Sequence, residues 1–180
     1  MRSRKFFKLG VGILFASISA TAGAEGLGAY VGAGVGVPVV AYGSSNLGHK
    51  VFGGAKVHEF PIKNAGAIEL AIQGEYVDFG SSNYWFTSVS STSMGVDAIG
   101  TWVIPKKWAG WADNKLAVVV KLGGNIVTEK WNSGSSYTYT GLARGVGAEY
   151  RVIPAVGVRL MHEQYPSGYS LISASGVFHF

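Results

Sequence analysis

The sequence predicts an all-β protein, an eight-stranded antiparallel up-and-down transmembrane β-barrel. Three observations lead to this fold class: a secretory leader, an alternation of apolar and polar residues with period two, and a low content of charge. Charged residues make up 14% of the 180 residues, against about 25% in ordinary soluble domains. Hydrophobic residues nevertheless reach 48%, and 27 residues are glycine. Alternating strands with so few charges are typical of sheets that expose one face to lipid.

The first 24 residues form the predicted leader. MRSRKFFK is a basic segment, LGVGILFASISA is apolar, and Ala22, Gly23 and Ala24 follow as a cleavage site of small residues. This order is that of a secretory signal peptide. The alternative, an uncleaved anchor helix, is disfavoured because the apolar segment is too short to span a bilayer. We therefore predict residues 1–24 as a signal peptide and residues 25–180 as one barrel domain, exported to the outer membrane.

The distribution of charge argues against nucleic-acid binding. The formal net charge is +5, but the leader carries four cations, Arg2, Arg4, Lys5 and Lys8, and no acidic residue. The remaining chain is therefore nearly neutral and offers no basic face for a nucleic acid. Cysteine is absent, which excludes disulfides and cysteine-ligated metal sites.

The first predicted strand, 27–37, has a helical alternative. Residues 26–43 carry no charge and contain the helix-packing pattern GxxxGxxxG at Gly28, Gly32 and Gly36. Glycine, valine and proline are poor or mediocre helix formers, however. The same residues alternate well as a strand, with tyrosine and glycine on one face and alanine and valine on the other. We predict a strand.

Seven further segments alternate with varying clarity. In 66–79, Ile68 and Leu70 fall on one face, and Glu69 and Glu75 fall on the other. Strands of about ten residues suit tilted spans of a closed barrel, and eight strands leave a lumen just wide enough for side chains. In order, the predicted strands are 27–37, 50–58, 66–79, 93–103, 115–128, 138–152, 156–165 and 169–180.

The connections between these strands alternate in character. One set is mostly rich in serine, glycine, asparagine and aromatic residues, and the other set contains proline. Because outer-membrane barrels have short periplasmic turns and longer external loops, we assign 59–65, 104–114 and 153–155 to the periplasm. The predicted external loops are 38–49, 80–92, 129–137 and 166–168.

Several pieces of the chain resemble a known family. They are YVGAGVG, AIELAIQGEYVDFG, GVGAEYRVIPAVGVRLMHEQY and a last strand that ends in Phe180. These pieces resemble the small outer-membrane barrels of the OmpA-like, opacity-type porin family, over essentially the whole mature chain. The resemblance implies the barrel architecture without a specific activity. It also implies that Phe178 and Phe180 form the carboxyl-terminal signal that the barrel-assembly machinery recognises.

Most charged residues of the predicted strands share one face. If Tyr76, Trp102 and Phe180 face lipid, the opposite parity places these charges in the lumen. A buried charge without a partner costs about 3–5 kcal/mol, so we expect them to pair and to close the lumen. The predicted lumen network is Lys50, Lys56, Glu69, Glu75, Asp97, Lys121, Glu149, Arg151, Arg159 and Glu163.

Antiparallel registers can be proposed that set opposite charges face to face. They also set apolar residues opposite one another on the other side of the sheet. The expected pairs are Lys50 with Glu75, Lys56 with Glu69, Asp97 with Lys121, and Glu149 with Arg159, the last with Val152 opposite Val156 and a turn at 153–155.

Residues that could carry chemistry are few. The four histidines, His49, His58, His162 and His179, lack metal-ligand spacing. Barrels of the lipid A deacylase type have a histidine and a serine two residues apart. Here the residue two positions after His162 is Gln164 instead of a serine. We therefore expect no metal, no cofactor and no catalytic site.

The predicted role is structural or surface-interacting. The expected contacts are outer-membrane lipid, lipopolysaccharide, the barrel-assembly machinery and an extracellular partner within reach of the external loops. The aromatic clusters 84–86 and Trp131 with Tyr137 and Tyr139 either contact such molecules or lie in the interfacial girdle. A small-solute channel and a lipid-A-modifying enzyme remain as alternative functions.

Overall fold

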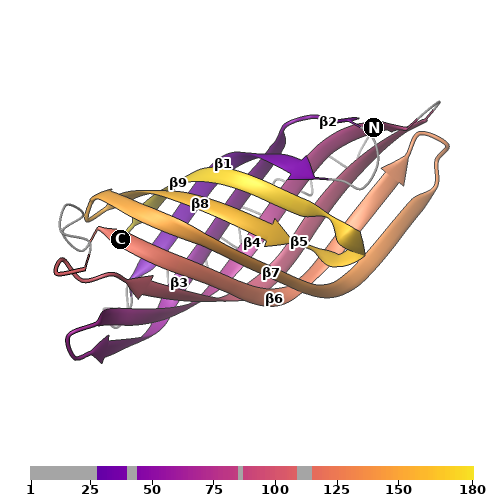
Figure 1. The fold of residues 1–180 in the computed structure, drawn as a ribbon. Helices are drawn as coiled ribbons and strands as arrows, with labels where there is room; N and C mark the ends of the chain where they lie inside the picture. Colours follow the sequence, from indigo (N-terminus) through magenta and orange to yellow (C-terminus); the bar gives the residue numbers. More distant parts are fainter. Residues whose placement is uncertain (1–27, 40–43, 85–86, 109–114) are drawn as a thin grey trace.

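The structure is a computed structural model that describes residues 28–39, 44–84, 87–108 and 115–180. In these ranges the chain forms one antiparallel sheet that closes into a ring (Figure 1). The order around the ring is β4-β3-β1-β9-β8-β7-β6-β5, and β5 pairs with β4 to close it. The predicted eight-stranded barrel is thus confirmed. The predicted signal peptide and its cleavage site lie outside the described residues.

Each long strand pairs with its neighbours in the chain, and β1 pairs with β9. A two-residue strand, β2 (Ser44–Ser45), adds to β4, and a 3-10 turn, η1 (Pro166–Gly168), joins β8 to β9. The long strands are β1 (Ala29–Val39), β3 (Gly48–Ile62), β4 (Gly66–Tyr84), β5 (Thr87–Val103), β6 (Leu116–Trp131), β7 (Ser136–Ile153), β8 (Val156–Gln164) and β9 (Ser170–His179).

No helix in the described part of the chain is long and apolar enough to cross a membrane.

Five strands extend further than the sequence predicted. β3 to β7 are 15 to 19 residues long, whereas β8 and β9 have 9 and 10. The segment 80–92, expected to be a loop, is mostly strand because β4 continues to Tyr84 and β5 begins at Thr87. Serine and threonine continue the ladder here, so a polar composition did not mark a loop. The β4–β5 and β6–β7 hairpins therefore project beyond β8 and β9 (Figure 1).

The barrel is polar inside and apolar outside. Leu122 is 57% exposed, whereas its neighbour Lys121 is 4% exposed; the same contrast holds between Leu160 (57%) and Arg159 (4%). Successive residues of a strand point to opposite faces, so one parity lines the lumen and the other forms the outer wall. This arrangement is the reverse of a water-soluble sandwich and suits a wall that faces lipid.

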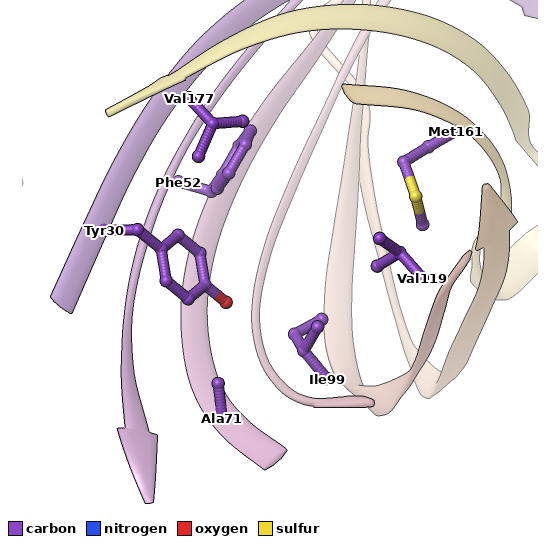
Figure 2. Close-up of a cluster of buried hydrophobic side chains, with 7 residues drawn as sticks. All are labelled: Tyr30, Phe52, Ala71, Ile99, Val119, Met161 and Val177. Carbon is purple, nitrogen blue, oxygen red and sulfur yellow. The ribbon is translucent and has the colours of Figure 1, made fainter. Parts of the chain in front are cut away.

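Part of the lumen is nevertheless apolar. Figure 2 shows one cluster of buried side chains that point toward one another inside the ring. Its members come from seven strands and are Tyr30, Phe52, Ala71, Ile99, Val119, Met161 and Val177. We call this group the inner apolar layer.

Glycine makes this filling possible. Gly32 of β1 lies directly opposite Phe52 of β3, and a Cβ at Gly32 would overlap the phenyl ring. Gly147 of β7 stands in the same relation to Met161 of β8. In a lumen of this width, a large side chain needs a neighbour without a side chain.

Candidate functional site

The central part of the lumen holds five charged side chains from five strands. Lys50 (β3), Glu75 (β4), Asp97 (β5), Lys121 (β6) and Glu163 (β8) are all almost fully buried. Lys50 Nζ lies 2.5 Å from Glu163 Oε1 and 3.1 Å from Glu75 Oε2. Lys121 Nζ lies 2.9 Å from Glu163 Oε1, contacts Glu75 Oε1, and lies 3.6 Å from Asp97 Oδ2. We call these five residues the central cluster.

A second group of charges surrounds Glu149, nearer the end where β9 terminates. Glu149 Oε2 accepts hydrogen bonds from Arg159 Nε at 2.9 Å and Nη2 at 2.7 Å. Its other oxygen contacts Arg151 Nε at 3.2 Å and His179 Nε2 at 2.9 Å. The guanidinium carbon of Arg159 also lies 5.1 Å from the centroid of the Tyr30 ring, within the range of a cation–π contact.

The charges at the rim of this end are more accessible. Arg151 Nη2 donates to Glu69 Oε2 at 2.8 Å, and Lys56 Nζ lies 2.7 Å from Glu59 and 3.8 Å from Glu69. A cavity of about 180 Å³ lies here, lined in part by these residues and bounded by Tyr30 and Arg159.

A second group of buried apolar side chains, the outer apolar layer, lies in the lumen near the opposite end. Tyr169 packs against this layer, and its hydroxyl donates to Glu129 Oε1 at 2.8 Å and lies 2.8 Å from Ser91 Oγ. Burial raises the pKa of Tyr169 to about 12, so the hydroxyl keeps its proton. The layer consists of Val77, Phe79, Val127, Ala143, Tyr165 and Leu171.

One predicted register agrees with the structure. Glu149 lies directly opposite Arg159. The turn beside them differs from the expected one, because Ile153 rather than Val152 pairs with Val156. The register shifts between Arg151 and Ile153, so the turn shortens to Pro154 and Ala155.

Two predicted registers are wrong by two residues. Lys50 lies opposite Val77 and Lys56 opposite Ala71, instead of Glu75 and Glu69. Asp97 lies opposite Gly123 instead of Lys121. These charges still make contact, but diagonally.

The physical reason is the width of the lumen. The position directly opposite a bulky side chain is often a glycine, as for Asp97 with Gly123 and Glu163 with Gly145. A Cβ at either glycine would crowd the carboxylate side chain. Other ion pairs cross the lumen between strands that do not adjoin, such as Lys50 of β3 with Glu163 of β8. Pairwise strand matching cannot find such contacts.

Several polar partners in the lumen were missed by looking only for charges. Gln73 Oε1 accepts from Tyr30 Oη at 3.1 Å and from Arg159 Nη1 at 3.3 Å. Asn125 Nδ2 donates to Asp97 Oδ1 at 3.0 Å. Both residues alternate in sequence with the lumen-facing charges of their strands, so the alternation could have identified them as lumen-facing.

The aromatic residues of the β6–β7 hairpin face inward. Trp131 lies opposite Val89, Tyr137 opposite Glu129, and Tyr139 opposite Val127. Val127 is fully buried, and the ladders contain no register shift, so these aromatics share the lumen parity. They therefore lie on the inner face of the projecting hairpin and not in a lipid-facing girdle. The other predicted cluster, 84–86, lies mostly outside the described residues.

The remaining predicted positions lie on the outer wall. His162 is exposed there, between Val146 and Ile172 of the neighbouring strands. Phe178 and Phe180 are 46% and 70% exposed. Their rings pack edge to face, with 5.0 Å between the ring centroids.

Comparisons with known proteins identify the fold. No family model and no curated protein matches the chain. Solved structures do match: Neisserial surface protein A (NspA) has a TM-score of 0.63 at 14% identity, covering 88% of this chain and 99% of that one. The N-terminal β-barrel domain of Pseudomonas aeruginosa OprF gives 0.60 at 13% identity, covering 85% and 97%.

A third similar structure is Ail, the attachment invasion locus protein of Yersinia pestis, in complex with the heparin analogue sucrose octasulfate. Its TM-score is 0.57 at 13% identity, covering 86% of this chain and 99% of that one. At these identities the likeness establishes the fold alone, that of small outer-membrane β-barrels, in agreement with the resemblance noted in the sequence.

Proposed function

We propose that the chain is an integral outer-membrane protein with a closed lumen and a structural or surface-interaction role, and that it is not an enzyme. The observation that carries this proposal is the filling of the lumen in successive layers. Charges around Glu149, the inner apolar layer, the central cluster and the outer apolar layer follow one another along the barrel. Every member of the two apolar layers is 8% exposed or less, so both layers are shielded from solvent.

The apolar outer wall supports a membrane location, and the shared fold of known outer-membrane barrels supports the outer membrane. The first strand begins and the last strand ends at the same end of the barrel, near Glu149. With both chain termini of the barrel domain in the periplasm, this end is the periplasmic one. The projecting β4–β5 and β6–β7 hairpins are then extracellular. Phe178 and Phe180 lie on the lipid-facing wall at the periplasmic rim, where the barrel-assembly machinery could bind them.

The extracellular hairpins are the proposed interaction surface. Tyr137 and Tyr139 are 52% and 38% exposed on the inner face of the β6–β7 hairpin, and the ring of Tyr137 lies edge to face with Trp131 at 6.5 Å. Exposed aromatic rings offer rigid contact area at low entropic cost. Similar barrels named as a surface protein and as an attachment protein support this role. The partner is lipopolysaccharide or another extracellular molecule.

Planar-bilayer recording tests the closed lumen against the channel alternative. Refolded wild-type protein should give no steady current. A known outer-membrane channel recorded in the same bilayer shows that the assay detects an open barrel. Steady current through the wild type would refute the closed lumen and establish the channel.

Binding of cells to lipopolysaccharide-coated and host-glycan-coated surfaces tests the interaction role. The double change Tyr137→Ser and Tyr139→Ser should lower binding. The matched control, Thr138→Ala with Thr140→Ala, alters the other face of the same strand and should not. Equal binding by all variants would refute the aromatic surface.

The enzyme alternative has less support. His162 lies on the outer wall, and Ser167, the first serine after it in the chain, lies in the η1 turn and not on the same strand. Mass analysis of lipid A from cells with and without the protein should give the same species. A modified lipid A that depends on the protein would overturn the non-enzymatic assignment.

A further inference from the structure

The central cluster has unequal numbers of acidic and basic groups. Among the described residues it contains three carboxyl groups, from Glu75, Asp97 and Glu163, and two ammonium groups, from Lys50 and Lys121. Every one of these residues is 4% exposed or less. With all five groups ionised, the cluster would hold a net charge of −1 between two apolar layers. An uncompensated charge is very costly in such surroundings.

Asp97 is the carboxyl group with the weakest compensation. Glu75 and Glu163 each contact both lysines. Of the two lysines, only Lys121 contacts Asp97. The distance from Lys121 Nζ to Asp97 Oδ2 is 3.6 Å, which is too long for a hydrogen bond. Asn125 donates to Asp97 Oδ1, but Oδ2 is buried and has no hydrogen-bond partner in the part of the chain that the structure describes.

Asp97 also faces a like charge. Glu75 Oε1 and Asp97 Oδ2 both contact the ammonium of Lys121, so the two carboxyl groups are close neighbours. Two carboxylates that share a site do not both ionise readily. The polar and charged groups that adjoin this site come from five other strands and the residue after β8: Lys50 (β3), Gln73 and Glu75 (β4), Lys121 and Asn125 (β6), Glu163 (β8), Ser173 (β9) and Tyr165.

A proton fits this site better than a metal cation. A Cβ at Gly123, directly opposite Asp97, would overlap the Asp97 carboxyl group, and one at Gly95 would overlap Asn125. A hydrated cation needs more room than one carbon atom, and the ammonium of Lys121 would repel it.

We infer that Asp97 holds a bound proton in the folded barrel near neutral pH, and that this proton makes the central cluster electrically neutral. The inference adds a proton-binding site to the proposed closed lumen. The proton removes the one charge that the two lysines cannot balance. A carboxyl group that keeps its proton at neutral pH is distinct from exposed aspartates and glutamates, which have lost theirs.

Infrared spectroscopy of the refolded protein detects the proton directly. The wild type should show the C=O band of a protonated carboxylic acid near neutral pH. The band should be absent in Asp97→Asn and unchanged in Asp78→Asn, whose carboxylate accepts from the Gly80 N–H outside the cluster. A wild type without the band would overturn the inference, as would a band that persists in Asp97→Asn.

Urea unfolding provides a second readout. Asparagine has the shape of a protonated aspartate and no charge, so Asp97→Asn should unfold at the wild-type urea midpoint or above. Glu163→Gln removes a carboxylate that both lysines contact, and it should unfold at a clearly lower midpoint. If Asp97→Asn lowers the midpoint as much as Glu163→Gln does, Asp97 is an ionised partner of Lys121 and the inference fails. If a variant does not fold, the wild-type spectrum still decides.

Discussion

Removing the carboxylate of Glu149 should destabilise the barrel strongly. Glu149 is 0% exposed and receives two hydrogen bonds from Arg159, whose side chain is 5% exposed. Glu149→Gln leaves the guanidinium buried, with the Gln73 carbonyl at 3.3 Å as a neutral acceptor. Breaking a buried pair on one side costs about 3–5 kcal/mol. We expect a loss of that size in the free energy of unfolding.

The reverse change should cost less. In Arg159→Gln, Glu149 keeps its contacts with Arg151 at 3.2 Å and His179 at 2.9 Å. The double variant should cost less than the sum of the two single changes, because no charge then lacks its partner.

The assay is urea unfolding of the refolded barrel in detergent or lipid, for the wild type, both single variants and the double variant. The matched control is Lys56 with Glu59, an exposed pair at 2.7 Å at the rim. Its coupling energy should stay below about 1 kcal/mol. Strict additivity for Glu149 and Arg159 would mean that the two side chains do not interact, which would refute the register of β7 and β8.

Three further predictions concern other parts of the chain. Deletion of Phe180 should reduce the amount of protein in the outer membrane, measured by immunoblot of membrane fractions; wild-type levels with normal heat-modifiable gel mobility would contradict its role in assembly. Gly32→Ala should lower the free energy of unfolding by about 1–3 kcal/mol, because the added carbon overlaps Phe52, and an unchanged urea midpoint would show that the ring moves freely. Sequencing of the membrane-extracted protein should begin at Glu25, and a mature chain that retains Phe6 and Phe7 would refute the cleavage site.

The faces of the strands were predictable from the sequence, but only one of the three proposed registers, that of Glu149 with Arg159, was correct. Parity alone correctly separated Lys121 from Leu122 and Arg159 from Leu160, because alternation is a property of the single strand. A register depends on the neighbouring strand, and the bulge between Lys56 and His58 shifts it without any local signal. The rule that charges face each other directly also failed for the central cluster.

The positions of the glycines contained more information than the charges did. Asp97, Glu163 and Phe52 each lie directly opposite a glycine. Matching large inward residues to glycines, instead of acids to bases, would have placed Asp97 opposite Gly123. This rule follows from the volume available inside eight strands, whereas ion pairs between flexible side chains tolerate a displacement of two residues.

The closed lumen that we propose limits where the barrel can contact a partner. Within the barrel, the inward-facing residues of β6 and β7 are packed or paired. Val119, Lys121 and Glu149 are examples. Beyond the outer apolar layer, the inward-facing residues of the same two strands are Trp131, Tyr137 and Tyr139. The shorter strands β8 and β9 do not reach this part of the hairpin. The inward face of these two strands is therefore buried inside the barrel and partly exposed in the projecting hairpin. In the closed barrel that we propose, this inner face of the hairpin is the part of the described barrel best suited to contact another molecule.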